Sequence, residues 1–446
     1  MSPESWSRRQ FLRISALTAA SAALSACARP TEELPATTES EEPTEPEATE
    51  ETVPSPEPEE NTLKVMHWNG KMTREAAFWD ENLQEFENRH PALTVDNNVV
   101  PFGEYTLNLE AMIAAGTPPD VFWGLTKILE LGRGKAVIDW YNYVDEDFLD
   151  GFYWGPVEHF IWDGELYAIP STAQTFGFFV HDTLMQELGL EPPETWDDLI
   201  AMAPDIRDAG LAPVVFGNQD KGTAWDFWLP LVAQYGGNAS EYDTQEKSWV
   251  DEPVIQAFEL LQRLVAAGVF IDGINGISRD QAYQLAFQGR SPMFYQGSWF
   301  PGVANSQAPE EYLGTYYVWP NPALKPGDPH LTADSSGRAW AVSKDRPNTD
   351  LGVEFVKYQC ELDVYKKYIA GVAEVPAMPE AIDAVEDEKV QVMTTFLEDG
   401  VRHILFDKGS SQAVGDVCAE IMAGVEMTPE EAAQKMQDIV EAARAG

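Results

Sequence analysis

Residues 63–95 read LKVMHWNGKMTREAAFWDENLQEFENRHPALTV and decide the fold class of this chain. The segment opens with a mainly apolar run and then reaches Asn69-Gly70, a dipeptide typical of turns. The apolar residues of positions 72–89 recur at helical spacing, and Pro91 ends this helix because proline cannot continue one. The last residues, Leu-Thr-Val, favour a second strand. A strand, a turn, a helix and a strand in this order predict an α/β fold.

The same alternation extends along most of the chain. Strands are predicted at 63–68, 93–95, 120–123, 168–170, 176–181, 214–216, 291–295, 316–319 and 338–342. Helices are predicted at 72–89, 104–115, 127–136, 182–189, 196–209, 225–235 and 253–267, and residues 350–445 are predicted to be mostly helical. Strands that alternate with helices favour an α/β fold with mostly parallel strand pairing.

Composition limits the classes of partner. Residues 61–446 are enough for two domains of ordinary size with sizeable cores. The chain carries a formal net charge of −45, most of it in this body. A field of that sign repels nucleic acid and anionic lipid headgroups, so we expect no nucleic-acid partner. No apolar run in the body is long enough to span a membrane.

The body contains two cysteines, Cys360 and Cys418. They could pair in an oxidising compartment, or both could be buried free thiols. The chain has no CxxC motif and no repeated spacing of cysteine and histidine, which argues against a zinc site. No cofactor is expected.

The N-terminal residues have the pattern of an export signal. Two adjacent arginines precede an apolar segment at 14–26 that is too short for a good membrane-spanning helix. The sequence SRRQFL at 7–12 resembles the twin-arginine export signal, although Sec signals also tolerate paired arginines. The sequence LSAC at 24–27 resembles the bacterial lipobox. The resemblance implies that residues 1–27 are a signal peptide and that an acylated Cys27 anchors the chain to the lipid bilayer.

Residues 28–60 are expected to form a disordered tether. They contain twelve Glu, seven Pro and almost no apolar residues, so they cannot bury enough surface to offset the entropy of ordering. Like charges and prolines keep such a segment extended. At roughly 3 Å per residue its limit is on the order of 100 Å. We therefore expect the tether to hold a folded body clear of the lipid surface.

The order of short motifs in the body resembles a known family. Residues 62–440 are similar to extracellular solute-binding proteins of the sugar-binding class, the group that includes maltose-binding protein. Each motif alone is weak, and their order and spacing carry the resemblance. The matching segments are FENRHPALTV at 86–95, AAGTPPDV at 114–121, DGELYAIP at 163–170, TWDDL at 195–199, GSW at 297–299 and SG at 336–337.

This resemblance implies a two-lobed periplasmic-binding-protein-like fold of type II, with a hinge of two or three crossing segments. One lobe would contain residues 62–172 and 327–376, and the other 173–326 and 377–446. A mono- or oligosaccharide would bind in the cleft between the lobes, which close around it. The chain would then be an extracytoplasmic, monomeric receptor that delivers its ligand to the membrane permease subunits of an ABC importer.

Sugar rings have apolar C–H faces that favour aromatic platforms, and hydroxyl groups that need fixed donors and acceptors. The chain has fourteen Trp, several of them at strand ends or in loops. These positions and the resemblance give the following candidate ligand-binding residues, of which Trp299 is the principal one: Trp68, Asn69, Tyr105, Trp123, Thr126, Lys127, Gln174, Trp225, Asp226, Ser298, Trp299 and Arg338.

Several of these residues also have a purely structural interpretation. Trp68 could belong to the core, and Asp226 could be a helix N-terminal charge favoured by the helix dipole. Arg338 could bond a ligand hydroxyl or bridge acidic neighbours such as Asp334. At the position of Thr126, members of the family often carry an acidic residue.

Two other functions are compatible with parts of the sequence. The same fold could bind a polyamine, a peptide or a metal ion, and the acidity would suit a cation. An extracellular glycosidase would need two carboxyl groups at a fixed separation, and among 74 acidic residues such a pair can always be found. No Gly-x-Ser-x-Gly, HExxH or Cys–His motif stands out, so an enzyme is not expected.

Overall fold

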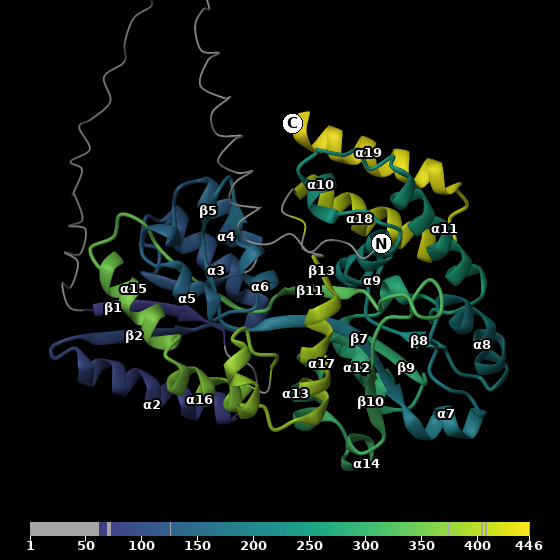
Figure 1. Cartoon of the computed structure of the whole chain (residues 1–446), viewed down its shortest axis with the longest axis horizontal. Coiled ribbons are helices and arrows are strands. Elements are labelled where there is room, and N and C mark those ends of the chain that lie inside the picture. The colour runs from purple at the N-terminus through teal and green to yellow at the C-terminus, as the bar shows by residue number, and fades with distance from the viewer. Residues whose placement is uncertain are drawn as a thin grey trace, which may run out of the picture.

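The computed structural model describes residues 62–68, 73–124, 126–372, 374–402, 405 and 408–445. Figure 1 shows two bodies of helices and strands side by side, with strands running between them. The expected signal peptide, tether and acylated Cys27 lie outside the described residues. Within the described part of the chain, no helix is both long and apolar enough to cross a membrane.

The first body is built around a mixed sheet. Its strands are β1 (Thr62–His67), β2 (Thr94–Val99), β3 (Val121–Gly124), β6 (Ile169–Pro170) and β12 (Ala339–Val342). They form one five-stranded sheet in the order β2-β1-β3-β12-β6. Around it lie α2 (Thr73–Arg89), α3 (Phe102–Ala114), α4 (Thr126–Arg133), η1 (Trp140–Asn142), α5 (Glu146–Asp150), α6 (Trp154–Glu158), the hairpin of β4 (Ile161–Trp162) and β5 (Glu165–Leu166), α15 (Thr349–Gln359) and α16 (Leu362–Val372). The short helix η3 (Pro379–Ala384) packs against α16 within the segment that leads from this body to the second one.

The second body has a second mixed sheet. Its strands are β7 (Ala173–His181), β8 (Val214–Val215), β9 (Met293–Gly297), β10 (Tyr316–Trp319), β11 (Thr332–Ser336) and β13 (Gly400–Arg402). Their order is β13-β11-β7-β9-β8, and β10 also pairs with β7. The helices are α7 (Asp182–Leu188), α8 (Trp196–Asp208), α9 (Gly222–Gln234), α10 (Ala239–Asp243), α11 (Glu252–Ala266), η2 (Ile274–Gly276), α12 (Arg279–Phe287), α13 (Phe300–Gln307), α14 (Glu310–Leu313), α17 (Glu388–Thr395), η4 (Phe396–Asp399), α18 (Lys408–Met422) and α19 (Pro429–Ala445).

The prediction of mostly parallel pairing is wrong. β1 is parallel to β2 and β3, but β12 is antiparallel to both of its neighbours, β3 and β6. The chain returns to the first sheet through β12 at the edge where β3 ends, with Ala339 opposite Gly124, so the two strands must run in opposite directions. In the second sheet, β7 is antiparallel to β9, β10 and β11.

The predicted alternation of strands and helices is present, and one helix start is fixed by a local device. Thr195 Oγ1 accepts a hydrogen bond of 3.2 Å from the Asp198 N–H, and the Asp198 carboxylate accepts one of 2.9 Å from the Thr195 N–H. This reciprocal pair is a capping box, and it begins α8 at the TWDDL motif.

The sequence does not predict β11 or β13. β11 falls in the range 327–376 expected for the first lobe, yet it pairs with β7 and β13 in the second sheet.

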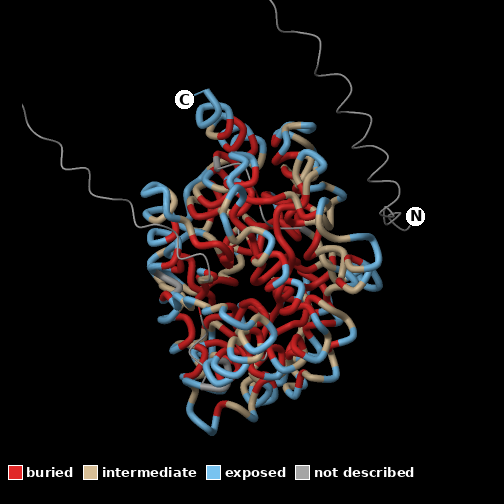
Figure 2. The backbone as a smooth tube through the Cα atoms, turned by 90° about the vertical axis from the view of Figure 1, so that its left-hand side faces the viewer, coloured by how far each residue is buried: buried red, intermediate tan, exposed pale blue. Residues whose placement is uncertain are grey.

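Two clusters of buried side chains form the core. One fills the first body and continues onto one face of the second sheet, where it includes Phe179 and Phe294. The other lies on the opposite face of that sheet and includes Trp228. Figure 2 shows buried backbone through the interior and exposed loops around it. Cys360 and Cys418 lie in different clusters and both are free thiols, so the alternative of a disulfide between them is wrong.

Three segments join the two bodies. The first links β6 to β7 through residues 171–172, the second links β11 to β12 through residues 337–338, and the third runs from α16 to α17. The backbone N–H groups of Ser171 and Thr172 both donate to the Arg338 carbonyl, at 2.6 and 3.2 Å. A Cβ atom at position 337 would lie 2.4 Å from Thr172 Oγ1, so the glycine there lets the first two segments approach each other.

Candidate functional site

The predicted ligand-binding residues gather at two sheet edges. In the first sheet, β1 and β3 are parallel, so their carboxyl ends share one edge, and β12 begins at that same edge. Trp68 follows β1 directly, and Arg338 directly precedes β12. Both residues therefore lie at the carboxyl edge of the first sheet.

The second sheet has a corresponding edge. β9 ends beside the start of β7, with Gly297 opposite Phe176. β8 is parallel to β9 and ends at this edge too, and the chain then enters α9, which carries Trp225 and Asp226. Because the first two crossing segments run directly from one edge to the other, the two edges face each other across them. Open α/β sheets bind ligands outside the carboxyl ends of their strands, which is where the first edge lies.

At the first edge, Trp68 covers two other predicted residues. Its ring centroid lies 4.7 Å from that of Tyr105 and 5.3 Å from that of Trp123, with both contacts edge-on. The Tyr105 hydroxyl donates to the Met66 and Trp123 carbonyls at 3.0 and 2.7 Å, which ties α3 to the ends of β1 and β3. Trp68 is 7% exposed, Tyr105 3% and Trp123 0%. In this conformation Tyr105 and Trp123 support Trp68 from beneath.

Beside this group lies His67, a residue that the sequence did not single out. Its ring is 4.4 Å from that of Trp79 and 4.9 Å from that of Trp123, and the residue is fully buried. Neither ring nitrogen forms a hydrogen bond of good geometry among the described residues, and the polar groups nearest to the ring are the Trp68 backbone and the Asn97 side chain. Burial lowers the pKa of His67 to about 4, and the positive charge of Arg338 acts in the same direction. The imidazole is therefore neutral at physiological pH.

The guanidinium of Arg338 has an acidic partner, as one of the two alternatives for this residue expects. It donates to Glu374 Oε1 at 2.8 Å and to the Tyr368 hydroxyl at 2.9 Å. It also lies 4.8 Å from the centre of the Trp123 ring, a cation–π distance. Arg338 is 6% and Glu374 8% exposed, so this ion pair is almost entirely buried. No local motif marks Glu374, which lies far along the chain from Trp123.

At the second edge, Trp299 is held from three sides. Its indole N–H donates to the Tyr283 hydroxyl at 3.0 Å, and the Arg279 guanidinium lies 5.4 Å from the centre of its ring. Phe176 meets it edge-on at 5.3 Å. A Cβ atom at Gly217 would lie 2.7 Å from the backbone where α12 begins, so the glycine permits the approach that brings Arg279 to this edge. Trp299 itself is only partly buried.

The other predicted residues of the second edge are on α9 and at the end of β9. Trp225 is partly buried on α9, and Asp226, 7% exposed, accepts a hydrogen bond of 2.8 Å from the Tyr295 hydroxyl through its backbone carbonyl. The Ser298 N–H donates to the Thr175 carbonyl at 2.9 Å.

The four remaining predicted residues are less informative. Gln174 accepts from the Ser335 hydroxyl at 3.4 Å. Lys127 forms ion pairs of 2.8 Å with both Glu110 and Glu130. Thr126 begins α4, where its side chain is not described, and Asn69 lies outside the described residues.

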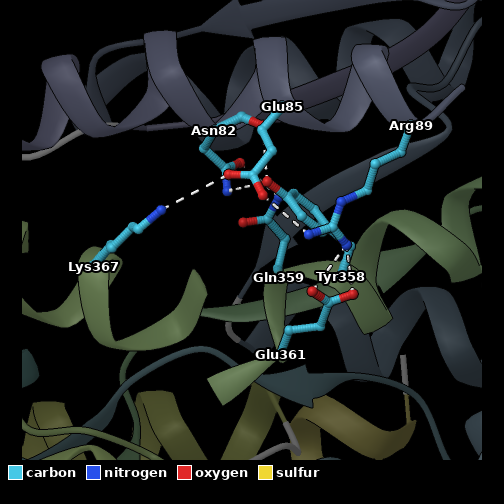
Figure 3. A network of polar contacts seen from close by, with 7 residues as sticks. All are labelled: Asn82, Glu85, Arg89, Tyr358, Gln359, Glu361 and Lys367. Atoms are coloured by element: carbon cyan, nitrogen blue, oxygen red, sulfur yellow. Dashed lines mark hydrogen bonds and ion pairs between the residues drawn. The ribbon is translucent and has the colours of Figure 1, made fainter. Parts of the chain in front are cut away.

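Two surface depressions lie elsewhere on the first body, and none of the predicted ligand-binding residues lines them. One has a volume of about 410 Å³ and is lined in part by Lys135 and Glu165. The other, about 550 Å³, is lined by residues of α2 and α15 and their surroundings. Figure 3 shows the polar network next to the larger one: Arg89 reaches Glu361 and Glu85, and its guanidinium lies 4.5 Å from the centre of the Tyr358 ring.

The chain is similar to known proteins over much of its length. Residues 69–359 match the family described as bacterial extracellular solute-binding protein. An uncharacterized ABC transporter extracellular-binding protein of Pyrococcus horikoshii is 28% identical over 255 residues, and this match spans 55% of the chain but only 58% of that protein. The multiple sugar-binding protein of Streptococcus mutans is 21% identical over 337 residues, which are 74% of this chain and 78% of that protein.

Solved structures share the fold over a larger part of the chain. The cyclic alpha-maltosyl-1,6-maltose binding protein of Arthrobacter globiformis has a TM-score of 0.73 at 17% identity, with 86% of this chain and 99% of that chain covered. The GacH receptor of Streptomyces glaucescens has a TM-score of 0.70 at 20% identity, with 86% and 98% covered.

Proposed function

This chain belongs to the family of bacterial extracellular solute-binding proteins, and from that premise we propose that it is the sugar receptor of an ABC importer. The predicted α/β, two-lobed fold of type II is confirmed by its structural relatives. The receptor captures a mono- or oligosaccharide between the lobes and delivers it to a membrane permease. It acts outside the cytoplasm as a monomer and catalyses no reaction.

One observation carries the proposal of a saccharide: tryptophans lie at both facing edges, and the two at the second edge are partly exposed. Trp299 and Trp225 belong to the second edge, and Trp68 belongs to the first. Aromatic rings on opposite walls suit the C–H faces of a sugar, and neighbouring polar groups such as Ser298 and Gln174 suit its hydroxyls. The names of relatives point the same way, since the Streptococcus mutans protein is a multiple sugar-binding protein and the GacH receptor was solved with acarbose.

The proposed binding residues keep the set predicted from the sequence, with roles refined by their burial. Trp68, Trp225 and Trp299 form the walls, and Asp226, Gln174 and Ser298 provide polar groups. Of the remaining members of the set, five are assigned to the first edge: Tyr105, Trp123, Thr126, Lys127 and Arg338. Asn69 stays in the set on its sequence position alone.

A saccharide panel tests the function. The purified chain is heated with each of a broad set of mono- and oligosaccharides, and hits are followed by calorimetry. A ligand that binds only the folded state at about 100 times its Kd adds roughly 2.7 kcal/mol of stability, so the melting temperature should rise by several degrees. Spermidine, a dipeptide mixture and divalent metal ions are the parallel arms. A response to one of these, with none to any sugar, would overturn the sugar assignment.

We further propose that the receptor is a lipoprotein. The paired arginines and the LSAC sequence support export and acylation at Cys27, and the Glu- and Pro-rich residues 28–60 suit a tether. The lipid would keep the receptor near its permease while the tether lets the lobes sample the solution. In a bacterial host, we expect Cys27→Ala to move the protein from the membrane to the soluble extracytoplasmic fraction, measured by fractionation and blotting. Cys360→Ala is the matched control and should stay with the membrane. Membrane retention of Cys27→Ala would exclude this anchor.

A further inference from the structure

The buried ion pair of Arg338 and Glu374 joins two of the three segments that connect the lobes. Arg338 lies in the second segment, between β11 and β12, and Glu374 opens the third, just after α16. The side chains are only 7% and 10% exposed, and the N–O distance is 2.8 Å. A charge buried to this extent cannot easily lose its partner, because the remaining ion would be left without compensation.

The hydroxyl of Tyr365 joins the first segment to the third in a similar way. It donates to the Ser171 carbonyl at 2.7 Å and accepts from the Ala377 N–H at 2.7 Å. The Ala173 N–H also donates to the Val375 carbonyl, at 2.9 Å. Tyr365 and the Arg338 partner Tyr368 lie one turn apart on α16. One helix of the first body therefore holds all three connecting segments.

This arrangement bears on the movement of the lobes. A change in the angle between two lobes must be taken up by backbone torsions in the segments that join them. The contacts of Arg338, Glu374 and Tyr365 restrict the backbone torsions in the middle of these connecting segments. Arg338 also lies against Trp123, which supports Trp68 at the first edge. The same guanidinium thus contacts both Trp123, which supports a wall of the proposed sugar site, and the hinge.

We propose that the Arg338–Glu374 pair sets the equilibrium between lobe arrangements, so that Arg338 acts as a positioning residue of the hinge. The inference rests on the proposed function, since lobe closure matters only if a solute is captured between the lobes. It differs from a purely structural role because breaking the pair should change which lobe arrangement is populated, and not merely the stability of the fold. The arrangement described here is the one in which the pair is formed, so its loss should depopulate that arrangement.

The experiment measures the distance between lobes without any ligand. Spin labels are placed at Asn88→Cys on α2 and Asp208→Cys on α8, both exposed, in the full chain with Cys27→Ala. The remaining thiols, Cys360 and Cys418, are buried. We expect Glu374→Gln to reduce the population of the wild-type distance about tenfold in double electron–electron resonance, the change that follows from losing a small part of a buried charge interaction.

The matched control breaks an ion pair of the same chemistry within one lobe. Arg89→Gln removes the exposed contacts to Glu361 and Glu85 seen in Figure 3, and it should leave the distance distribution unchanged. If circular dichroism shows that Glu374→Gln does not fold, Arg338→Lys is measured in the same way. We expect it to reduce the population of the wild-type distance about threefold, because lysine keeps the positive charge but cannot donate to Glu374 and Tyr368 in the geometry of a guanidinium. A folded variant at the hinge with the wild-type distribution overturns the proposal. The measurement uses no ligand, so that result would not contradict the sugar assignment. Conversely, a saccharide panel without any hit would not change the distances measured between the lobes.

Discussion

Replacing Trp299 with alanine is expected to lower the affinity for the saccharide found in the panel about 100-fold, or roughly 2.7 kcal/mol. The indole is already fixed by Tyr283, Arg279 and Phe176, so a sugar ring that stacks on it orders little that was mobile before. Removing the ring deletes both the apolar contact and the prepared surface. Calorimetric titration measures the loss, and the melting temperature of the free variant shows that the fold is retained.

Two further variants separate the stacking surface from other effects of a lost tryptophan. Tyr283→Phe keeps every ring but removes the hydroxyl that accepts from the indole, and we expect a loss of about three- to tenfold, the value of one hydrogen bond. Trp162 on β4 is also partly buried and lies beneath an arginine, Arg133, at 5.1 Å, but outside the two facing edges. Trp162→Ala should bind the sugar like the wild type. Equal affinity of Trp299→Ala and Trp162→Ala would remove Trp299 from the site.

The fold was predictable where local pattern and tertiary environment agree. Residues 62–99 became β1, α2 and β2 close to their expected bounds because an apolar run, a helical spacing and a proline mark the three elements. β11 was not predictable in this way, since Thr-Ala-Asp-Ser-Ser at 332–336 has little strand propensity. All five of its residues are nevertheless buried, because the pairing with β7 and β13 decides the conformation. Strand direction depended likewise on where the chain crosses between bodies, which no local pattern encodes.

The candidate site was predictable in its aromatic residues and not in their partners. Trp68 and Trp299 follow strands, and a sheet edge is where ligands bind, so sequence position was informative for both. Glu374 and Tyr283 reach the site from distant elements and carry no motif of their own. Helix α12, which bears Tyr283, could have been found from the capping box of Ser278 and Gln281 at its start. His67 looked like one more member of an apolar strand, and only the rings packed around it reveal its environment.

That environment predicts a pH dependence of stability. In the folded protein the pKa of His67 is lowered to about 4, whereas an unfolded histidine has the ordinary value of 6.5. Below pH 6.5 the His67 imidazole is therefore protonated in the unfolded chain, whereas in the folded chain it stays neutral until the pH reaches about 4. The contribution of His67 is complete above pH 6.5 and is lost as the pH falls towards 4. Its size is on the order of 3 kcal/mol, from about 1.4 kcal/mol for each unit of pKa difference.

The substitution His67→Phe isolates this contribution from the many carboxylates that also titrate. Phenylalanine fits an aromatic cluster and has no proton to exchange. Urea unfolding at pH 7 and pH 4 should show that wild-type stability falls by on the order of 3 kcal/mol more than that of His67→Phe. Trp340→Phe, in the same cluster, tests for packing damage alone and should lower stability equally at both pH values, because no titrating group is lost. If the stability of the wild type and of His67→Phe fell by the same amount, the imidazole would gain a proton in the folded state as readily as in the unfolded one. The buried ring of His67 would then have to be hydrated in solution.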